Sequence, residues 1–426
     1  MRREDAAGGL RVALAHIDGL VLMRGDTSET DVAQTLGPVF ADLHVHIGRS
    51  QDGKPVKISG SKDLTFSNIA REASERKGIE LVGVIDCHSP AVQAEMEACL
   101  ASGDMQEVEG GGIRYRRTTI VPGIEMEVKE EGGGPFHLLG YLPTLAAMKE
   151  WTAWLKPRVT NISLSSQRVR ASARELQREL LDRGGLLVPA HVFTPHRGLL
   201  GCSADRLSDR LDLDGIAAVE LGLSADTAMA GTLSQLDAIP FLTNSDAHSV
   251  GMIGRECNEL LLAEPSFAEF AKALKGADGR HIVANYGLHP RLGKYHTTYC
   301  RGCGKAVSSA EATTGGCPFC GSHKLVRGVE GRISQLADRK AAPSEVRRPP
   351  YRAHVPLSFF PGIGPATREK LFTEAGTEMD VLHRLPESLI ASVAGSKAAA
   401  LIIAAREGRL DFVAGNGGTY GAIVLS

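Results

Sequence analysis

Short apolar runs alternate with helical patterns over about 250 residues, and this order limits the possible folds more than any other feature of the chain. Apolar runs bounded by turn residues are typical of buried strands, whereas apolar residues three or four positions apart indicate helices. Their repetition predicts an α/β fold with a parallel barrel or sheet, whose chemistry lies at the carboxyl ends of the strands. The expected strands are 41–47, 81–86, 120–128, 136–141, 186–192, 217–222 and 239–245, and the expected helices are 66–77, 91–101, 145–155 and 169–183.

Size and composition set the number of domains and the protein class. Because a domain usually has about 100 to 200 residues, the 426 residues predict several domains. A content of 43% hydrophobic and 23% charged residues excludes fibrous and wholly disordered proteins. The most apolar N-terminal stretch, 10–23, is interrupted by Arg11, His16 and Asp18, so we expect no membrane segment and a cytoplasmic location.

The formal charge of -2 hides an uneven distribution along the chain. Residues 280–356 carry 13 Lys and Arg against 4 Asp and Glu, an excess of +9 that leaves the remainder at -11. A basic segment on an acidic body is typical of a protein that holds a polyanion with one part and does chemistry with another. Taken alone, the pattern fits a solvated basic linker equally well.

Histidines and carboxylates occur together where the expected strands end. Asp42-Leu-His44-Val-His46 places two imidazoles on one face of a strand, which is a chelating arrangement. One such cluster alone is more often a core or surface histidine. Six clusters, each on a different expected strand, indicate a metal centre instead. The other five contain Asp86 with His88, Glu125 with Glu127, His137, His191, and Asn244-Ser-Asp246-Ala-His248.

Imidazole and carboxylate ligands together suit zinc, manganese or iron. A carboxylate such as Glu125 can bridge two ions and hold them at the separation that phosphoryl chemistry needs. Metal-activated water would then be the nucleophile, and no Ser-His-Asp or Cys-His arrangement is required. The chain also lacks the G-x-x-x-x-G-K-[ST] motif, which argues against a nucleotide-hydrolysing motor.

These motifs resemble the polymerase and histidinol phosphatase (PHP) superfamily over about residues 41–286. The resemblance implies a distorted (βα)7 barrel, a trinuclear metal centre and hydrolysis of phosphoesters. It also implies the ligands: His44, His46, Glu125 and Asp246 for the first ion and as the catalytic residues, Glu125, His137 and His191 for the second ion, and His248 for the third.

The third ion site departs from the family pattern. Where the family has Thr-Asp-His, this chain has Ile85-Asp86-Cys87-His88, displaced by one position. The acidic or histidine ligand expected shortly after the first motif is at best Asp52. Asp86 and His88 remain candidate ligands, and we expect two or three divalent ions (Zn²⁺, Mn²⁺ or Mg²⁺), with two favoured.

Four of the eight cysteines form C-x2-C-x13-C-x2-C, and the other four are scattered. Each C-x2-C turn offers two thiolates to one tetrahedral ion, so Cys300, Cys303, Cys317 and Cys320 predict a structural zinc site. The zinc-binding segment either braces its neighbours or contacts phosphates. Its basic side chains favour the second role: Arg301, Lys305, Lys324, Arg327 and Arg332.

Two glycine-containing turns precede helical patterns near the C-terminus. In Pro361-Gly362-Ile-Gly364 the turn leads into a helix whose free N–H groups and dipole can hold a phosphate. A second such turn, with Gly395, follows about 30 residues later, and the pair resembles helix-hairpin-helix halves. A lone Gly-x-Gly is usually just a turn, but the pairing after a basic segment favours binding to the DNA backbone. The expected DNA-binding residues are Gly362, Gly364, Arg368, Lys370, Gly395 and Lys397.

The order of the segments, together with Ala-His191-Val-Phe-Thr-Pro195 and Glu220-Leu-Gly-Leu-Ser-Ala-Asp226, resembles the endonuclease Q family across nearly the whole chain beyond residue 40. The resemblance implies a DNA repair endonuclease that cuts 5′ to deaminated bases (uracil, hypoxanthine, xanthine) and abasic sites. Loops with Phe193, Thr194, His196, Arg197 and 224–226 are candidates for base recognition. The expected units are an N-terminal extension (1–38), a PHP domain (39–290), a four-cysteine zinc-binding domain (291–336), a basic linker (337–356) and a helix-hairpin-helix-like domain (357–426).

Two other classes stay open. One is a PHP-type phosphatase or exonuclease without lesion specificity, and the other is an accessory DNA-binding protein with a decayed metal site. The near-complete ligand set disfavours decay. Damaged DNA is the expected partner, and a sliding clamp is considered, although 415–426 contains no obvious clamp-binding peptide.

Overall fold

The computed structural model describes residues 35–308, 316–413 and 422–424. Residues 1–34, which make up most of the expected N-terminal extension, and most of 415–426 lie outside the described residues. Leu36–Ser426 forms one compact unit. Within the described residues, no helix is both long enough and apolar enough to cross a membrane.

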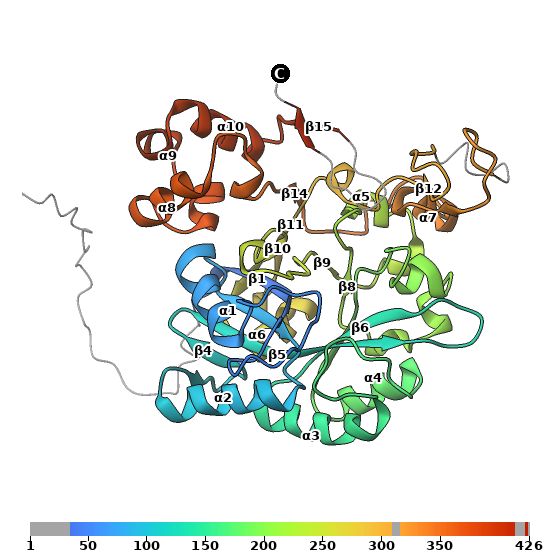
Figure 1. Ribbon diagram of the computed structural model, residues 1–426, viewed down its shortest axis with the longest axis horizontal. Helices are drawn as coiled ribbons and strands as arrows, with labels where there is room; N and C mark the ends of the chain where they lie inside the picture. The colour runs from blue at the N-terminus through green and yellow to red at the C-terminus, as the bar shows by residue number, and fades with distance from the viewer. Residues whose placement is uncertain (1–34, 309–315, 414–421, 425–426) are drawn as a thin grey trace, which may run out of the picture. The chain divides into compact units, whose positions relative to one another are not determined.

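The seven strands expected from the sequence are all present, and they form a ring. Five of them, β1, β5, β6, β8 and β9, are labelled in Figure 1. Neighbours pair in the order β1-β2-β5-β6-β7, and β8 pairs with β9. Backbone hydrogen bonds complete the ring, from Ala217 N to Leu187 O (2.9 Å) and from Ala247 N to His44 O (3.1 Å). These strands are β1 (Gly37–His46), β2 (Leu81–Ile85), β5 (Thr118–Val128), β6 (Phe136–Tyr141), β7 (Leu186–Pro189), β8 (Val219–Glu220) and β9 (Phe241–Leu242).

The strand directions correct the expectation of a parallel arrangement. β1, β2 and β5 are parallel, but β6 runs antiparallel to both β5 and β7. The ring is therefore a distorted α/β barrel. Because β6 is reversed, His137 near its beginning lies opposite Glu127 near the end of β5, so the two histidine and carboxylate clusters meet.

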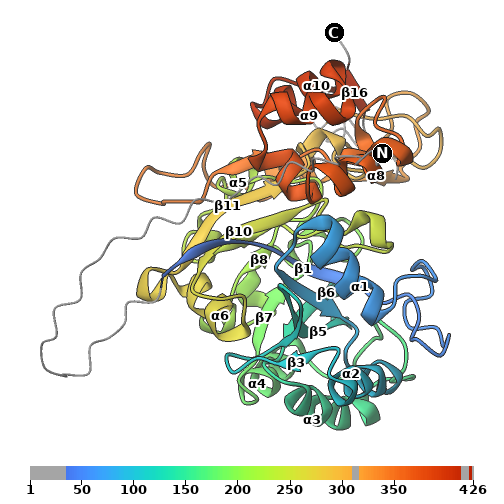
Figure 2. The ribbon, with the colours of Figure 1, turned by 90° about the vertical axis from the view of Figure 1, so that its left-hand side faces the viewer.

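Further strands, which the alternation did not predict, extend the sheet beyond the ring. β10 lies antiparallel to β1, β11 lies antiparallel to β10 (Figure 2), and β3 and β4 form a hairpin beside β5. β3 and β4 are joined by a short turn, as antiparallel neighbours can be, whereas the segment between β10 and β11 contains a helix, Phe267–Lys275. The bounds are β3 (Gln106–Glu107), β4 (Ile113–Tyr115), β10 (Cys257–Leu262) and β11 (His281–Gly287).

The helices cover the outside of the ring, and α2, α3 and α4 lie along one side of it (Figure 1). Thr144, Ser172 and Ser266 cap α3, α4 and α6 by accepting a backbone N–H of the first turn. Leu43, Val121, Tyr141, Val188 and Leu242 belong to one buried cluster of the barrel. The helices are α1 (Phe66–Glu72), continued as a π-helix over Ala73–Lys77, α2 (Pro90–Ser102), α3 (Leu145–Leu155), α4 (Ala173–Leu181), α5 (Thr227–Ala230) and α6 (Phe267–Lys275).

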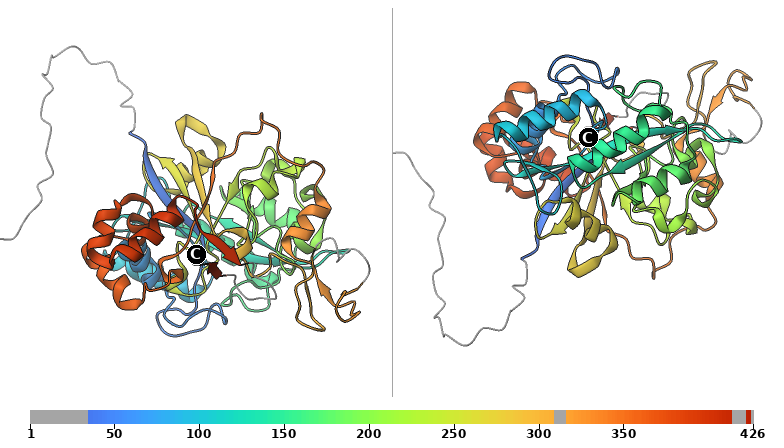
Figure 3. Two further views of the ribbon diagram at one scale, coloured as in Figure 1. Left: turned by 90° about the horizontal axis from the view of Figure 1, so that it is seen from above. Right: turned by 90° about the horizontal axis from the view of Figure 1, so that it is seen from below.

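The C-terminal part contains the cysteine segment and a helical group. α8, α9 and α10 gather into one group (Figure 3). A buried ion pair between Lys77 and Glu378 joins this group to the barrel. The elements are β12 (Tyr299–Cys300), β13 (Leu325–Val326), α7 (Val329–Leu336), α8 (Pro365–Glu374), α9 (Glu387–Ala394), α10 (Ser396–Arg406), β15 (Asp411–Val413) and β16 (Ala422–Val424).

The segment 337–356, expected as a basic linker, is attached to the barrel. Within this segment, Tyr351–Ala353 form strand β14, which pairs with β11 in parallel. Arg339 pairs with Asp237, and Arg348 donates to the carbonyl oxygens of Leu236 and Ile239. Part of its positive charge is therefore used within the protein.

A buried carboxyl group beside β10 makes stability depend on pH. Glu256 is fully buried, its Oε1 accepts from Leu288 N (2.6 Å), and its Oε2 has no hydrogen-bond partner among the described residues. Burial raises the pKa of Glu256 to about 8. The unfolded chain ionises this group near pH 4.3, so its stabilising contribution is complete below that pH and is lost as the pH rises through about 8.

Between pH 6 and pH 9, Glu256 ionisation should lower the free energy of unfolding by on the order of 2 kcal/mol. The Glu256→Gln variant cannot ionise, so its thermal unfolding midpoint should fall less between these pH values than that of the wild type. The exposed Glu97→Gln variant is the matched control. An identical pH dependence in Glu256→Gln and wild type would contradict this assignment.

Candidate metal centre and nucleic-acid interface

The end of β1 brings two imidazoles to one point. His44 Nε2 and His46 Nε2 lie 3.3 Å apart and both rings are fully buried. Asp246 Oδ1 lies 3.5 and 3.4 Å from these nitrogens, and Glu125 oxygens lie 3.6 Å from each. His44, His46 and Asp246, with Glu125 beside them, are called the His44 group.

A second group shares Glu125. His137 Nδ1 lies 2.6 Å from Glu125 Oε1, and His191 Nε2 lies 3.5 Å from the same oxygen. Glu125, His137 and His191, called the His137 group, come from β5, from β6 and from the turn after β7. Glu125 thus lies next to both groups and brings them together at one place in the barrel.

Both groups fit divalent ions. An ion bound at about 2.0–2.2 Å by a tetrahedral set of N and O ligands separates those ligands by roughly 3.3–3.6 Å. In the His44 group, His44 Nε2, His46 Nε2 and Asp246 Oδ1 lie 3.3–3.5 Å apart. Each group therefore can hold a metal ion, and mixed imidazole and carboxylate ligands suit Zn²⁺ or Mn²⁺.

The carboxylates around the two ligand groups make the site favourable for a cation. Burial by itself would lower the pKa of His44, but Glu220, Asp246 and Glu125 raise it to about 10. Burial also opposes ionisation of Glu125 and Asp246, yet neighbouring histidines hold the pKa of both carboxyls well below the usual range. The site therefore keeps its carboxylates ionised, as ligands for a cation must be.

Supporting side chains orient the candidate ligands. His44 Nδ1 lies 3.0 Å from Glu220 Oε2, and since a carboxylate only accepts, the Nδ1–H donates and leaves Nε2 for an ion. Glu220 also accepts from His191 N (2.9 Å) and Asn244 Nδ2 (2.9 Å). Asn244 Oδ1 in turn accepts from Leu43 N. Glu220 was not among the expected site residues, although its position at a strand end is the signal that identified the others.

The Glu220→Gln variant should bind metal about 10- to 100-fold more weakly, because an amide cannot accept from all three donors and carries no charge. Chelator competition against Mn²⁺ or Zn²⁺ measures this. The Glu97→Gln variant, which removes an exposed carboxylate, should leave the affinity unchanged. Equal affinities in Glu220→Gln and wild type would show that Glu220 does not position His44.

Asp86 and His88, which were expected as ligands, lie outside the two ligand groups. Asp86 Oδ2 lies 3.0 Å from His46 Nδ1 and accepts from Ile47 N (2.9 Å), so it orients His46. His88 Nε2 lies 3.2 Å from the carbonyl oxygen of Leu164, outside both groups. His248 lies beside His46, with ring centroids 4.8 Å apart, and its Nδ1 faces Asp246 O (3.0 Å). Among the described residues, the structure thus gathers two ligand groups in the barrel.

Lys57 and Ser166 are site residues that sequence reasoning missed. Lys57 Nζ donates to Glu125 Oε2 (3.2 Å) and to Ser166 Oγ (2.6 Å), and Ser166 Oγ donates to the same carboxylate oxygen. Both come from loops without periodic or motif signals. Lys57 places a fixed positive charge on the wall of the site.

Strained backbone is concentrated at the site. Of the non-glycine residues that the structure describes, six have positive φ, and four of these lie here: Asp86 (143°), Ser166 (51°), His191 (29°) and Asp246 (46°). Such conformations cost energy and persist where the surroundings impose them, most often at functional sites. The positions of the two ligands His191 and Asp246 are therefore fixed by the fold.

A cavity of about 220 Å³ opens onto both ligand groups. Of the residues expected to recognise a base, Thr194, His196, Arg197 and Ser224 line it, but Phe193 and Ala225 are buried in the core. Asp226 instead caps α5. The sequence did not point to Lys294 and Tyr295, which complete the wall from the segment after β11.

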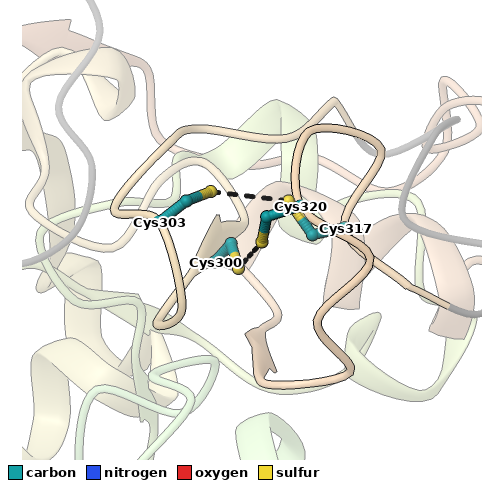
Figure 4. A group of neighbouring side chains, drawn as sticks. All are labelled: Cys300, Cys303, Cys317 and Cys320. Atoms are coloured by element: carbon teal, nitrogen blue, oxygen red, sulfur yellow. Dashed lines mark hydrogen bonds between the residues drawn. The ribbon is translucent and has the colours of Figure 1, made fainter.

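The four cysteines of the C-x2-C pairs converge in the structure (Figure 4). Cys300 Sγ and Cys320 Sγ lie 3.6 Å apart, as do Cys303 Sγ and Cys317 Sγ, and all four are free thiols. Zinc with four thiolates at about 2.3 Å requires S···S separations of about 3.8 Å. The cluster therefore fits one tetrahedral ion.

The basic side chains near the four cysteines have different environments. Arg332 donates to Leu200 O and pairs with Asp205, so it ties α7 to the barrel. Lys305 lies 4.7 Å from the centre of the Phe319 ring, which is half exposed. The cysteine segment thus braces the barrel through Arg332.

The two glycine turns of the helical group lie at the surface. Gly362 and Gly395 have φ of 82° and 87°, a conformation that glycine adopts without strain. Gly364 and Gly395 directly precede α8 and α10, and Lys397 is exposed, whereas Arg368 is half-buried. Lys370 Nζ donates to Val393 O (3.1 Å), which joins α8 to the end of α9.

Comparison with known proteins extends the assignment. A profile described as PHP-associated matches residues 228–278. The uncharacterized protein YqxK of Bacillus subtilis is 51% identical over 387 residues, which is 90% of this chain and 99% of YqxK. The uncharacterized protein MJ0043 of Methanocaldococcus jannaschii is 37% identical over 224 residues, covering 48% of this chain and 28% of MJ0043.

Two crystal structures superpose on the chain with a TM-score of 0.79 and 34% identity. One is the lesion-specific endonuclease PfuEndoQ from Pyrococcus furiosus, with 91% of this chain and 96% of that chain covered. The other is endonuclease Q with a 27-mer duplex substrate that has an abasic lesion at its active site, with 92% and 97% covered.

The mixed barrel with its two ligand groups defines a PHP-type protein with a candidate metal centre. The match over nearly the full length of PfuEndoQ is more specific. The chain belongs to the endonuclease Q family.

Proposed function

We propose that this protein is a metal-dependent DNA repair endonuclease that hydrolyses the phosphodiester 5′ to deaminated bases (uracil, hypoxanthine, xanthine) and to abasic sites. The observation that carries the proposal is a two-group ligand site open to a cavity, in a chain that matches a lesion-specific endonuclease over 91% of its length. The crystal complex of endonuclease Q with a duplex that has an abasic lesion at its active site supports this substrate class.

In this proposal the His44 group and the His137 group would hold one divalent ion each. Divalent ions, when bound, activate water and stabilise charge on phosphate oxygens. Asp86 and Glu220 hold the two β1 imidazoles in place. The ammonium group of Lys57, which already lies at Glu125, contributes positive charge that attracts the phosphate to be cut.

The cavity takes the extruded nucleotide. A base within a duplex is out of reach, so a nuclease that reads it must unstack it, and deaminated or missing bases cost less to unstack. Thr194, Ser224 and Tyr295 provide hydroxyl groups and Arg197 provides N–H donors at the wall. The glycine turns before α8 and α10 contact the DNA backbone, and the four-cysteine zinc site keeps its segment folded.

The alternative is a PHP-type phosphatase or exonuclease without lesion specificity. The comparisons give contact with a sliding clamp no support, and most of 415–426 lies outside the described residues. To separate the alternatives, the purified protein is incubated with Mg²⁺, Mn²⁺ or Zn²⁺ on p-nitrophenyl phosphate and, in parallel, on a circular duplex with one deoxyuridine.

The proposal predicts nicking of the circle and little release of nitrophenol. A circle has no end, so an exonuclease leaves it intact, and a phosphatase acts on the ester alone. Nicking of an undamaged circle at the same rate would contradict the lesion specificity.

A further inference from the structure

Ile58 is 81% exposed, more than any other large apolar side chain that the structure describes. It lies at the tip of a β-turn in which Gly60 N donates to Lys57 O (2.9 Å). Isoleucine is β-branched and apolar, and turn tips usually carry Gly, Asn, Asp, Pro or Ser. Packing among the residues that the structure describes does not account for an isoleucine at this position.

The turn that carries Ile58 is held firmly. Gly48 and Gly60 meet backbone to backbone, so that a Cβ on Gly60 would lie 2.8 Å from Gly48 Cα. Val56 is buried, and its carbonyl oxygen accepts from Ser165 N (3.0 Å). Lys57 N donates to Ile47 O (2.9 Å) at the end of β1. The backbone that carries Ile58 is thus held in place on the barrel.

The same contacts place Ile58 at the rim of the candidate site. The preceding residue, Lys57, extends its side chain to Glu125 and lines the cavity. Three residues later, Ser61 N donates to the carbonyl oxygen of His248, another cavity residue (2.8 Å). Ile58 therefore lies between two points at which the turn contacts the site.

The charge of this loop indicates what it faces. Residues 49–63 contain Arg49, Lys54, Lys57 and Lys62 against Asp52 and Asp63, and Lys54 pairs with Asp52. A basic loop with one exposed apolar tip suits a duplex, because the cations approach phosphates while the tip meets stacked bases.

We propose that Ile58 is a wedge that enters the base stack and fills the space left by the extruded nucleotide. The inference rests on the proposed function and deepens it. Removing a nucleotide from the stack exposes apolar base faces to water, and proteins that distort DNA commonly insert Ile, Leu, Phe or Met at such a step. A stiff side chain on a fixed turn loses little conformational entropy on insertion.

The test compares single-turnover cutting of the same deoxyuridine strand in a duplex and as a single strand. Ile58→Ala should cut the duplex about 10- to 100-fold more slowly and the single strand at nearly the wild-type rate, since a single strand has no stack to open. Ile58→Leu should restore most of the duplex rate. Leu213→Ala, at an exposed apolar position on another loop, is the matched control and should act as wild type does.

A second measurement does not require cutting. A duplex with 2-aminopurine next to the lesion is bound by wild type and by Ile58→Ala in the presence of a chelator, and fluorescence reports unstacking. Wild type should raise the fluorescence and Ile58→Ala should raise it much less.

An equal loss of rate on duplex and single strand, or an equal rise in fluorescence with both proteins, would overturn the wedge. Failure of the wild type to cut any lesion-containing strand would instead overturn the proposed function, while the fluorescence still tests Ile58.

Discussion

The Asp246→Asn variant should cut a lesion-containing duplex at least about 10³-fold more slowly than the wild type and still bind it. Asp246 Oδ1 lies within 3.5 Å of both β1 imidazoles and is the carboxylate of the His44 group. An amide of the same shape binds a divalent ion far more weakly, and the contribution of such an ion to transition-state stabilisation is several kcal/mol, at 1.36 kcal/mol per tenfold in rate.

Single-turnover kinetics measure the cutting rate, and gel-shift titration measures the affinity for the duplex. The exposed Asp182→Asn variant controls for the loss of one negative charge. Metal content, measured by mass spectrometry, should fall by one ion per barrel in Asp246→Asn. A variant that cuts at the wild-type rate would show that the barrel site does not perform the chemistry.

The second large effect concerns the four cysteines. Replacing Cys303 by serine should remove the zinc ion that they hold, because one thiolate of the tetrahedral set is lost and a structural zinc site contributes on the order of 10 kcal/mol to folding. We expect one zinc fewer per chain, proteolytic cleavage near the cysteines, and at least about tenfold weaker binding to duplex DNA. The barrel should keep its own ions.

The Cys99→Ser variant is the matched control, because Cys99 lies on α2 and contacts Ser67 rather than the cluster. An unchanged zinc content in Cys303→Ser would contradict the zinc assignment. A loss of zinc without any change in duplex binding would restrict the cluster to bracing the barrel, the role that Arg332 already indicates.

The sequence predicted the seven ring strands because each is a buried apolar run. It pointed to most of the candidate ligands because each follows or lies in such a run. It did not predict the reversal of β6 or the added strands β10 and β11, since direction depends on tertiary pairing and not on local periodicity. Residue type and spacing also did not reveal that Asp86 Oδ2 lies 3.0 Å from His46 Nδ1.

Lys57 and Ile58 show a different limit. Both lie in a loop without periodicity, where a basic residue beside an apolar one carries no signal about position. Only the folded contacts, with Gly48 against Gly60 and Ser61 bonded to His248, place one side chain in the site and the other at its rim. The expected domain division separated 337–356 as a linker because of its basic composition. In the structure this segment is attached to the barrel by Arg339 and by strand β14.

The most direct test of the central claim is the position of the cut. A duplex labelled at one end, with a single deoxyuridine, is incubated with the protein and a divalent ion, and the products are resolved beside a sequencing ladder. The account predicts one product, cut on the 5′ side of the deoxyuridine with a 3′-hydroxyl and a 5′-phosphate, and no product with Asp246→Asn or from an undamaged duplex. A ladder of products receding from one end, or equal cutting of undamaged DNA, would contradict it.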